Sequence, residues 1–187
     1  MLGRTSLLIA TAALMIASSP PADDPGLYQA MLVNLAGDST TSTFVVQSTP
    51  VQMSAPTEAD WERLGIETAA LKTAVAASPA ADTAPFGAAS FPAGVKLVSR
   101  EAVQALFRTA AAGATIDDRW KTFRERYAAK SLQGFSRPVI TADGLEALIY
   151  YTHSCGSLCG EAGYAWLRRA SKTAPWRVAK RLPKVIA

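Results

Sequence analysis

From Ser131 onward the hydrophobic pattern changes from helical to alternating, and this change constrains the fold more than any other feature of the chain. Residues 132–140 predict a first strand, which Pro138 interrupts, and Asp143-Gly144 predicts the turn after it. Residues 145–152, 164–169 and 176–186 alternate in the same way and predict three further strands. Their short connections favour antiparallel pairing, because parallel strands need long crossovers. We therefore expect a C-terminal, antiparallel four-stranded meander.

Helical periodicity dominates the chain before residue 131. The stretch from Thr57 to Asp60 has the pattern of a capping box, and the apolar residues behind it predict one amphipathic helix that ends near Ser78. Further helices are predicted over residues 26–36, 99–113 and 116–127. Short strands are predicted within 43–53 and 95–98, and Pro50 places the first at a sheet edge or divides it.

Helices followed by a sheet predict an α+β domain in which N-terminal helices pack on the C-terminal meander. Helix followed by meander is the cystatin/NTF2-like arrangement, an analogy of fold that implies no function.

The N-terminal 22 residues predict an export signal. Arg4 precedes an apolar run from Leu7 to Ala17, and small residues and prolines follow it. A run of this length is too short to span a bilayer, which takes about 20 residues, and no later segment is long and apolar enough to be transmembrane. We expect residues 1–22 to be a signal peptide and residues 23–187 to form a single domain, periplasmic or secreted. Within it, residues 80–94 predict a flexible Ala/Pro/Gly loop.

Charge is distributed unevenly along the chain. Residues 1–118 contain six Lys or Arg and eleven Asp or Glu, whereas residues 119–187 contain thirteen and four. Such a basic half favours an anionic partner, either an envelope component or an acidic protein, and it also suits a strand face whose charges pair with the acidic half. We do not expect an exported protein to bind nucleic acid. The sequence identifies no particular partner.

Both cysteines and the only histidine lie in residues 153–160, between two predicted strands. In an oxidising compartment, Cys155 and Cys159 are expected to form a disulfide that staples the hairpin. Two alternatives stay open. Reduced thiols together with His153 would give a soft His/Cys₂ set for copper(I) or zinc, and His153 with Cys155 could form a thiolate–imidazole nucleophile. We expect the disulfide, with no metal and no cofactor.

Other catalytic patterns are missing from the sequence. It contains no Gly-x-Ser-x-Gly elbow, no Walker loop, no Gly-x-Gly-x-x-Gly and no His-Glu-x-x-His. We therefore assign no catalytic residue and favour a non-catalytic function. Aromatic and basic residues flank the cysteine loop, and those on the outer face could form a small binding surface: Tyr150, Tyr164, Trp166, Arg168 and Arg169.

An ordered set of short motifs gives the C-terminal half a resemblance to other proteins. The motifs are Trp120-x-x-Phe123-x-x-x-Tyr127, Phe135-Ser136-Arg137-Pro138, Asp143-Gly144-x-x-Ala147-Leu148-Ile149-Tyr150, His153-Ser154-Cys155-Gly156-Ser157-Leu158-Cys159-Gly160, Gly163-Tyr164 and Trp176-Arg177-Val178. Together, over about residues 118–180, they resemble a group of uncharacterised bacterial secreted or lipid-anchored proteins. The chain departs from the group's pattern at Ala128, where proline is usual, and at Ala174-Pro175-Trp176, where Gly-x-Trp is usual. The resemblance implies export and the hairpin fold, and it implies no activity.

These features together predict an exported, non-catalytic binding or structural module of the bacterial envelope. The alternative is a thiol-redox or copper/zinc-handling protein that uses the His-x-Cys-x-x-x-Cys loop. The two differ in the state of the thiols, because only the second requires Cys155 and Cys159 to be reduced.

Overall fold

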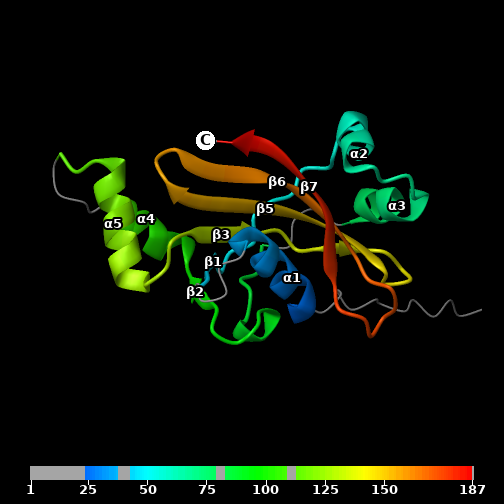
Figure 1. Ribbon diagram of the computed structural model, residues 1–187, viewed down its shortest axis with the longest axis horizontal. Coiled ribbons are helices and arrows are strands. Elements are labelled where there is room, and N and C mark those ends of the chain that lie inside the picture. The colour runs from blue at the N-terminus through cyan, green and yellow to red at the C-terminus, as the bar shows by residue number, and fades with distance from the viewer. Residues whose placement is uncertain (1–23, 38–42, 79–82, 109–112, 187) are drawn as a thin grey trace, which may run out of the picture.

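The computed structural model describes residues 24–37, 43–78, 83–108 and 113–186 (Figure 1). Its helices are α1 (Pro25–Ala36), α2 (Glu58–Leu64), α3 (Ala69–Ala77), α4 (Arg100–Arg108) and α5 (Ile116–Tyr127), with a 3₁₀ turn, η1 (Ala88–Ser90). Its strands are β1 (Val45–Gln47), β2 (Lys96–Val98), β3 (Leu132–Phe135), β4 (Val139–Ile140), β5 (Glu146–Gly156), β6 (Cys159–Arg168) and β7 (Arg177–Ile186). The predicted signal peptide lies outside the described residues. None of the described helices has the length and hydropathy that a membrane crossing requires.

The strands form one sheet of order β2-β1-β3-β5-β6-β7, in which β4 also pairs with β5. The predicted α+β class is confirmed, and the predicted antiparallel pairing holds from β3 through β5 and β6 to β7. In the part of the chain that the structure describes, the sheet has seven strands, more than the expected four. One reason is that Pro138 separates β3 from β4, because proline has no N–H to donate to a ladder. The other is that β1 and β2 extend the sheet beyond β3.

The strand β1 differs most from its prediction. It pairs in parallel with β2 on one side and with β3 on the other, so it is an interior strand and not an edge strand. The parallel pairs are possible because helices bridge both crossovers, α2 and α3 before β2, and α4 and α5 before β3. Pro50 lies beyond Gln47, the last residue of β1, and therefore removes no hydrogen bond from this ladder.

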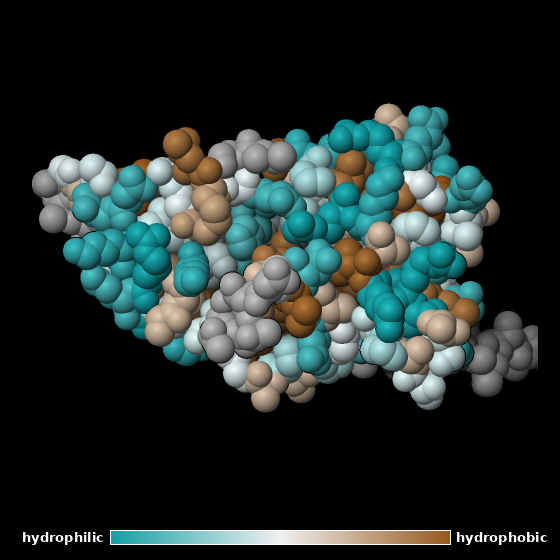
Figure 2. All heavy atoms as spheres, viewed as in Figure 1, coloured by the Kyte–Doolittle hydropathy of each residue, from teal (hydrophilic) through white to brown (hydrophobic). Residues whose placement is uncertain are grey.

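Helices cover both faces of the sheet. Because side chains alternate along a strand, β5 places Ile149 and Tyr151 in one core with α1, and Leu148 in a second core with α2 and α3. A third core joins α4 and α5 to β1 and β2. In Figure 1, α4 and α5 lie at one end of the sheet, α2 and α3 lie at the other, and α1 lies between them. On the face shown in Figure 2, hydrophobic side chains form small separate patches among hydrophilic ones.

The single helix predicted over residues 58–78 is wrong, because the chain forms α2 and α3 instead. Gly65 adopts the left-handed conformation, with φ 71° and ψ 29°, and its N–H closes the C-terminus of α2 on the carbonyl of Glu62. The apolar residues on both sides of the break still pack in one core, since Leu64 and Leu71 are both buried there. The apolar spacing therefore continues across Gly65, and for this reason the sequence pattern of the two helices resembled that of one helix.

Two aromatic side chains fix the described part of the predicted flexible loop. Phe86 and Phe91 are buried against Tyr28 of α1, at ring-centroid distances of 5.5 Å and 4.5 Å. The N–H of Phe86 also donates to the carbonyl of Ser48, directly after β1, at 2.7 Å. Phe86 and Phe91 therefore anchor residues 83–94 to the α1 core, and residues 80–82 lie outside the described residues.

Two helices begin with the same capping box in different surroundings. The pairs Thr57/Asp60 of α2 and Thr115/Asp118 of α5 exchange the same reciprocal hydrogen bonds. Asp60, however, is only 3% exposed and accepts a hydrogen bond from Lys184 of β7 at 2.5 Å, whereas Asp118 is exposed. The hydrogen bonds from Lys184 and from the Thr57 backbone lower the pKa of Asp60 to about 2.

The substitutions Asp60→Ala and Asp118→Ala separate the buried ion pair from the cap that both helices share. Asp60→Ala should lower the free energy of unfolding by about 2–3 kcal/mol, and Asp118→Ala by about 1 kcal/mol. Because folding lowers the pKa of Asp60, its contribution is complete above about pH 5 and is lost as the pH falls toward 2. Urea unfolding at pH 7 and pH 3 measures both effects. Equal losses for the two variants at pH 7 would contradict a stabilising role for Lys184.

Strands β6 and β7 approach closely at Gly163, where the register shifts at a bulge. A Cβ atom at Gly163 would overlap the carbonyl group of Leu182, whereas one at Gly156 would meet its nearest neighbour, the Cβ of Cys159, at 3.8 Å. We expect Gly163→Ala to cost about 3 kcal/mol, because backbone atoms must move, and Gly156→Ala to stay within about 0.5 kcal/mol. Thermal unfolding of both variants tests this. A tolerated Gly163→Ala would show that β7 can slide away from β6.

Candidate functional site

The β5–β6 hairpin ends in the two-residue turn Ser157–Leu158, and the predicted disulfide closes it. The Cα atoms of Cys155 and Cys159 are 5.1 Å apart, within the ordinary range for a disulfide. Cys155 is the extra residue at a register shift between Ser154 and Gly156, and such a bulge breaks strict alternation of side chains. Leu158 is 88% exposed at the tip. The hairpin thus holds its two sulfur atoms directly below an exposed apolar turn.

His153 lies on the adjacent part of β5, between two strands that both contribute to its surroundings. It pairs with Gln133 of β3 on one side and with Glu161 of β6 on the other. Its Nδ1 atom lies 3.0 Å from the Oε1 atom of Gln133. Burial lowers the pKa of His153, the charge of Glu161 opposes that shift, and the charge of Arg181 adds to it. The imidazole is therefore neutral near pH 7.

A polar network continues from His153 across the same face of the sheet. The hydroxyl of Tyr151 donates to the carboxylate of Glu161, and Arg181 of β7 lies 3.3 Å from the same Oε1 atom. Arg181 also lies over the Tyr151 ring, 5.9 Å from its centroid. Burial raises the pKa of Tyr151, and the Glu161 carboxylate raises it further. The hydroxyl therefore stays protonated and acts as a donor at physiological pH.

The sequence-predicted metal set is brought together at this end of the hairpin. One ligand atom from each of His153, Cys155 and Cys159 lies within 4.8 Å of the other two. A disulfide has no free thiolate, so the oxidised hairpin offers no metal-ligating sulfur. The same bond also leaves Cys155 unable to act as a nucleophile. The metal and nucleophile alternatives therefore apply only to the reduced hairpin.

The predicted aromatic and basic surface divides between the two faces of the sheet. Tyr150, Tyr164, Trp166 and Arg168 share one face, because Tyr150 pairs with Tyr164 and Leu148 of the same face pairs with Trp166. Tyr164 is buried there, and its hydroxyl donates to the carbonyl of Ser54 at 2.9 Å. Burial raises the pKa of Tyr164. This tyrosine is part of the core that α2 and α3 cover.

The basic residues of that surface already have partners. Arg168 lies over the Trp166 ring at 5.2 Å and pairs with Glu146 at 3.3 Å. Arg169 lies on the other side of the sheet, where it stacks on Trp176 at 4.3 Å and pairs with Asp24 at 3.3 Å. The five residues therefore do not meet in one place, and Arg169 belongs to a different region.

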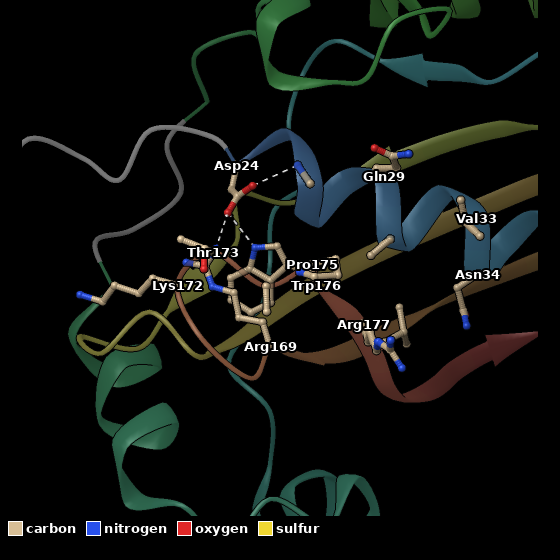
Figure 3. A pocket seen from close by; sticks show the side chains of 14 residues that line it. Asp24, Gln29, Val33, Asn34, Arg169, Lys172, Thr173, Pro175, Trp176 and Arg177 are labelled. Atoms are coloured by element: carbon tan, nitrogen blue, oxygen red, sulfur yellow. Dashed lines mark hydrogen bonds and ion pairs between the residues drawn. The ribbon is translucent and has the colours of Figure 1, made fainter.

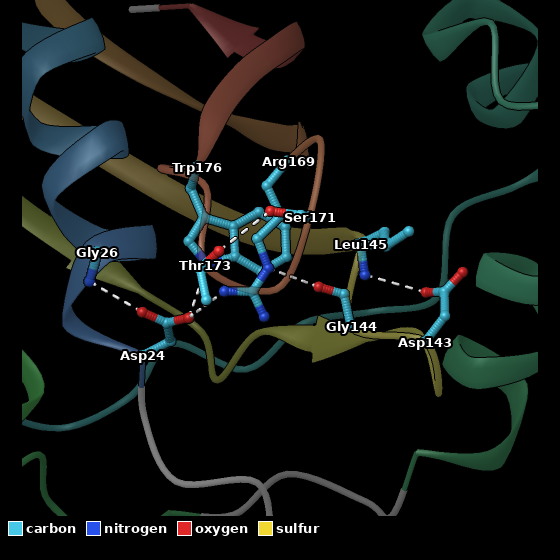
Figure 4. A network of polar contacts seen from close by, with 9 residues as sticks. All are labelled: Asp24, Gly26, Asp143, Gly144, Leu145, Arg169, Ser171, Thr173 and Trp176. Atoms are coloured by element: carbon cyan, nitrogen blue, oxygen red, sulfur yellow. Dashed lines mark hydrogen bonds and ion pairs between the residues drawn. The ribbon is translucent and has the colours of Figure 1, made fainter.

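That region centres on the carboxylate of Asp24 (Figure 4). Asp24 caps α1 by accepting from the N–H of Gly26, and it also accepts from the indole N–H of Trp176 at 2.7 Å. Arg169 donates from Nη1 to Asp24 and from Nε to the carbonyl of Gly144 at 2.6 Å. One carboxylate thus joins the start of α1, the end of β6 and the start of β7.

Beside this network, α1 and the β6–β7 connection enclose a groove of about 630 Å³ (Figure 3). Gln29, Val33 and Asn34 line it from α1, and Lys172, Trp176 and Arg177 line it from the other side. Among the residues that the structure describes, Lys172 and Arg177 have no ion-pair partner, and both are exposed. The groove thus offers two exposed cations, of which Lys172 also interacts electrostatically with Asp143, and an exposed apolar side chain, Val33.

No protein-family model, curated protein or solved structure matches this chain. The resemblance to uncharacterised secreted or lipid-anchored proteins therefore stays a prediction. The functions of the groove and of the hairpin are therefore inferred from their geometry.

The groove is the feature that sequence reasoning missed. Arg169 was singled out as a surface residue, yet its partner Asp24 lies 145 positions earlier. A possible indication was the aspartate directly before Pro25, which is a common arrangement for a helix N-cap. No local pattern connects that cap to Trp176.

The disulfide can be tested as a structural element by removing it. A closed loop between cysteines four positions apart contributes about 2 kcal/mol on the chain-entropy model. We expect Cys155→Ser/Cys159→Ser to lower the free energy of unfolding by that amount, and the reduced wild type to match the variant. Guanidinium unfolding of the three forms measures this. An unchanged stability would mean that the β5–β6 ladder alone fixes the hairpin.

Proposed function

We propose that this protein is an exported, non-catalytic binding module that holds an anionic component of the bacterial envelope in the α1–β7 groove. The observation that carries the proposal is the pair of cations at the groove, Lys172 and Arg177, which lack an ion-pair partner among the described residues. Exposed cations beside a concave surface attract anions and raise their local concentration. An anion is therefore the ligand class that best complements the groove.

The surroundings of the two cations strengthen this interpretation. Asp24, the acidic residue of the groove, is already paired with Arg169 and bonded to Trp176, so its charge is largely compensated. Gln29 and Asn34 add amide donors from the opposite wall. Val33 adds an apolar contact, since it is 58% exposed. These groups favour a ligand with an anionic head and a short apolar portion, such as the headgroup region of an anionic lipid.

The remaining predictions fit this proposal without being required by it. A disulfide at Cys155–Cys159 suits an oxidising compartment, as does a signal peptide over residues 1–22. We also propose that the module has the cystatin/NTF2-like arrangement, in which a helix packs on an antiparallel meander. The packing of α1 on β5 and β6 supports this. The aromatic face at Trp166 is a weaker candidate for binding, because Arg168 and Glu146 already neutralise each other there.

The groove can be tested by reversing the charges of its two exposed cations. Lys172→Glu/Arg177→Glu should weaken binding of glycerol phosphate, a soluble anionic headgroup, by tenfold or more, because attraction becomes repulsion. Backbone amide shifts of the labelled protein during titration give the affinity and the location. In the wild type, the shifts should centre on residues 29–34 and 172–177.

The matched control is Lys121→Glu/Lys130→Glu, which makes the same change in net charge at exposed positions outside the groove. It should bind as the wild type does. An equal loss in the control, or shifts spread over the whole basic surface, would mean that the anion is attracted by net charge and that the groove is not a site.

A further inference from the structure

We propose that the reduced β5–β6 hairpin binds one copper(I) ion through His153, Cys155 and Cys159, and that Gln133 positions the histidine for it. This inference concerns the opposite region of the sheet from the groove and does not depend on it. Three observations carry it: the closeness of the three ligand atoms, the hydrogen bond between the imidazole and Gln133, and the lack of a free fourth ligand among the described residues.

The three ligands are already grouped by the backbone. One ligand atom of each lies within 4.8 Å of the other two, and the Cα atoms of the cysteines are 5.1 Å apart. The ladder between β5 and β6 holds this spacing, because Gly156 pairs with Cys159 beyond the bulge and His153 pairs with Glu161 before it. Reduction therefore frees two sulfur atoms without releasing the strands. Rotation about two Cα–Cβ bonds is enough to separate the sulfurs around an ion.

Gln133 contacts the imidazole through the ring nitrogen Nδ1 and can hold the ring in place. It is 2% exposed, and its Nε2 atom donates to the Ser131 hydroxyl at 2.8 Å. With the amide in this orientation, Oε1 faces His153 and lies 3.0 Å from Nδ1. Oε1 can only accept, so Nδ1 carries the proton and Nε2 keeps its lone pair. A metal-ligating histidine typically makes this kind of hydrogen bond with its other nitrogen, which fixes both the tautomer and the ring orientation.

The ligand set favours copper(I) over zinc. Thiolate sulfur is a soft ligand that suits copper(I), and imidazole nitrogen accepts copper or zinc, whereas structural zinc almost always takes four ligands. Glu161, which pairs with His153 across the β5–β6 ladder, is a candidate for a fourth ligand. It is already bonded to Tyr151 and paired with Arg181, and among the described residues it does not belong to the ligand group. Three ligands remain, which copper(I) accepts.

The site must be opened by reduction. A dithiol reductant transfers two electrons and two protons to the disulfide, leaves as its own disulfide, and gives the thiols of Cys155 and Cys159. Copper(I) then replaces both thiol protons, which pass to solvent, and the metal keeps its oxidation state. In the oxidised protein the two sulfur atoms are bonded to each other, so the hairpin binds no copper.

Anaerobic competition with bathocuproine disulfonate, a coloured copper(I) chelator, tests the proposal. The purified protein, reduced with a phosphine, should remove one equivalent of copper(I) from the chelator, with a thiolate-to-copper absorption band in the ultraviolet. The oxidised protein and Cys155→Ser/Cys159→Ser should remove none. Lys172→Glu/Arg177→Glu should bind copper(I) as the wild type does, which separates this site from the groove.

Gln133 is tested by two substitutions of similar size. Gln133→Met removes the acceptor for Nδ1–H and should weaken copper(I) binding by about 10- to 100-fold, whereas Gln133→Glu keeps an acceptor and should retain most of the affinity. Because Gln133 is buried, Ser131→Ala provides a milder variant that frees the amide to rotate. It should weaken binding several-fold while the melting temperature stays close to that of the wild type.

Each contrary result has a definite meaning. Failure of the reduced protein to remove copper(I) from the chelator would overturn the site. Stoichiometric zinc binding without copper(I) binding would overturn the choice of metal. Copper(I) affinity that is unchanged in both Gln133→Met and Ser131→Ala would overturn the positioning role of Gln133.

Discussion

The hydrogen bonding of β5 on both of its edges is the interaction on which the rest of the structure depends. It pairs with β3 and β4 along one edge and with β6 along the other. Because its side chains alternate, the same eleven-residue strand contributes to the core under α1 and to the core under α2 and α3. Its last residues carry His153 and Cys155 to the end of the sheet where α5 lies. The core and the hairpin site are therefore two ends of one strand.

Local pattern was enough to predict the parts of the fold that local contacts determine. The alternation after Ser131 predicted β5, β6 and β7. The two cysteines predicted the disulfide between β5 and β6, because a hairpin joins residues that are close in sequence. The parallel position of β1 was not predictable in this way. Its three residues carry no pattern that distinguishes an interior parallel strand from an edge, and its partners lie across two helical crossovers. Gly65 was missed because the apolar spacing continues on both sides of it.

In the candidate sites too, groups that are close in sequence were predictable and groups that are far apart were not. His153, Cys155 and Cys159 were predictable as a group, since one hairpin carries them all. Gln133 was not, because only the β3–β5 register brings it to His153. The exit from α5 was not predictable either, because Ala128 takes a left-handed conformation, with φ 52°, that non-glycine residues rarely adopt.

The unequal charge of the two halves is resolved by contacts between them. Asp60 of the acidic half pairs with Lys184, and Asp24 pairs with Arg169, so the basic strands help to hold the N-terminal helices on the sheet. Asp24 and Trp176 lie 152 positions apart, and their hydrogen bond helps to fix α1 on its core. Contacts of such long range form late, because a large loop must close first. During synthesis, α1 can pack on Phe86 and Phe91 early, but its tie to Trp176 can form only when almost the entire chain has been made.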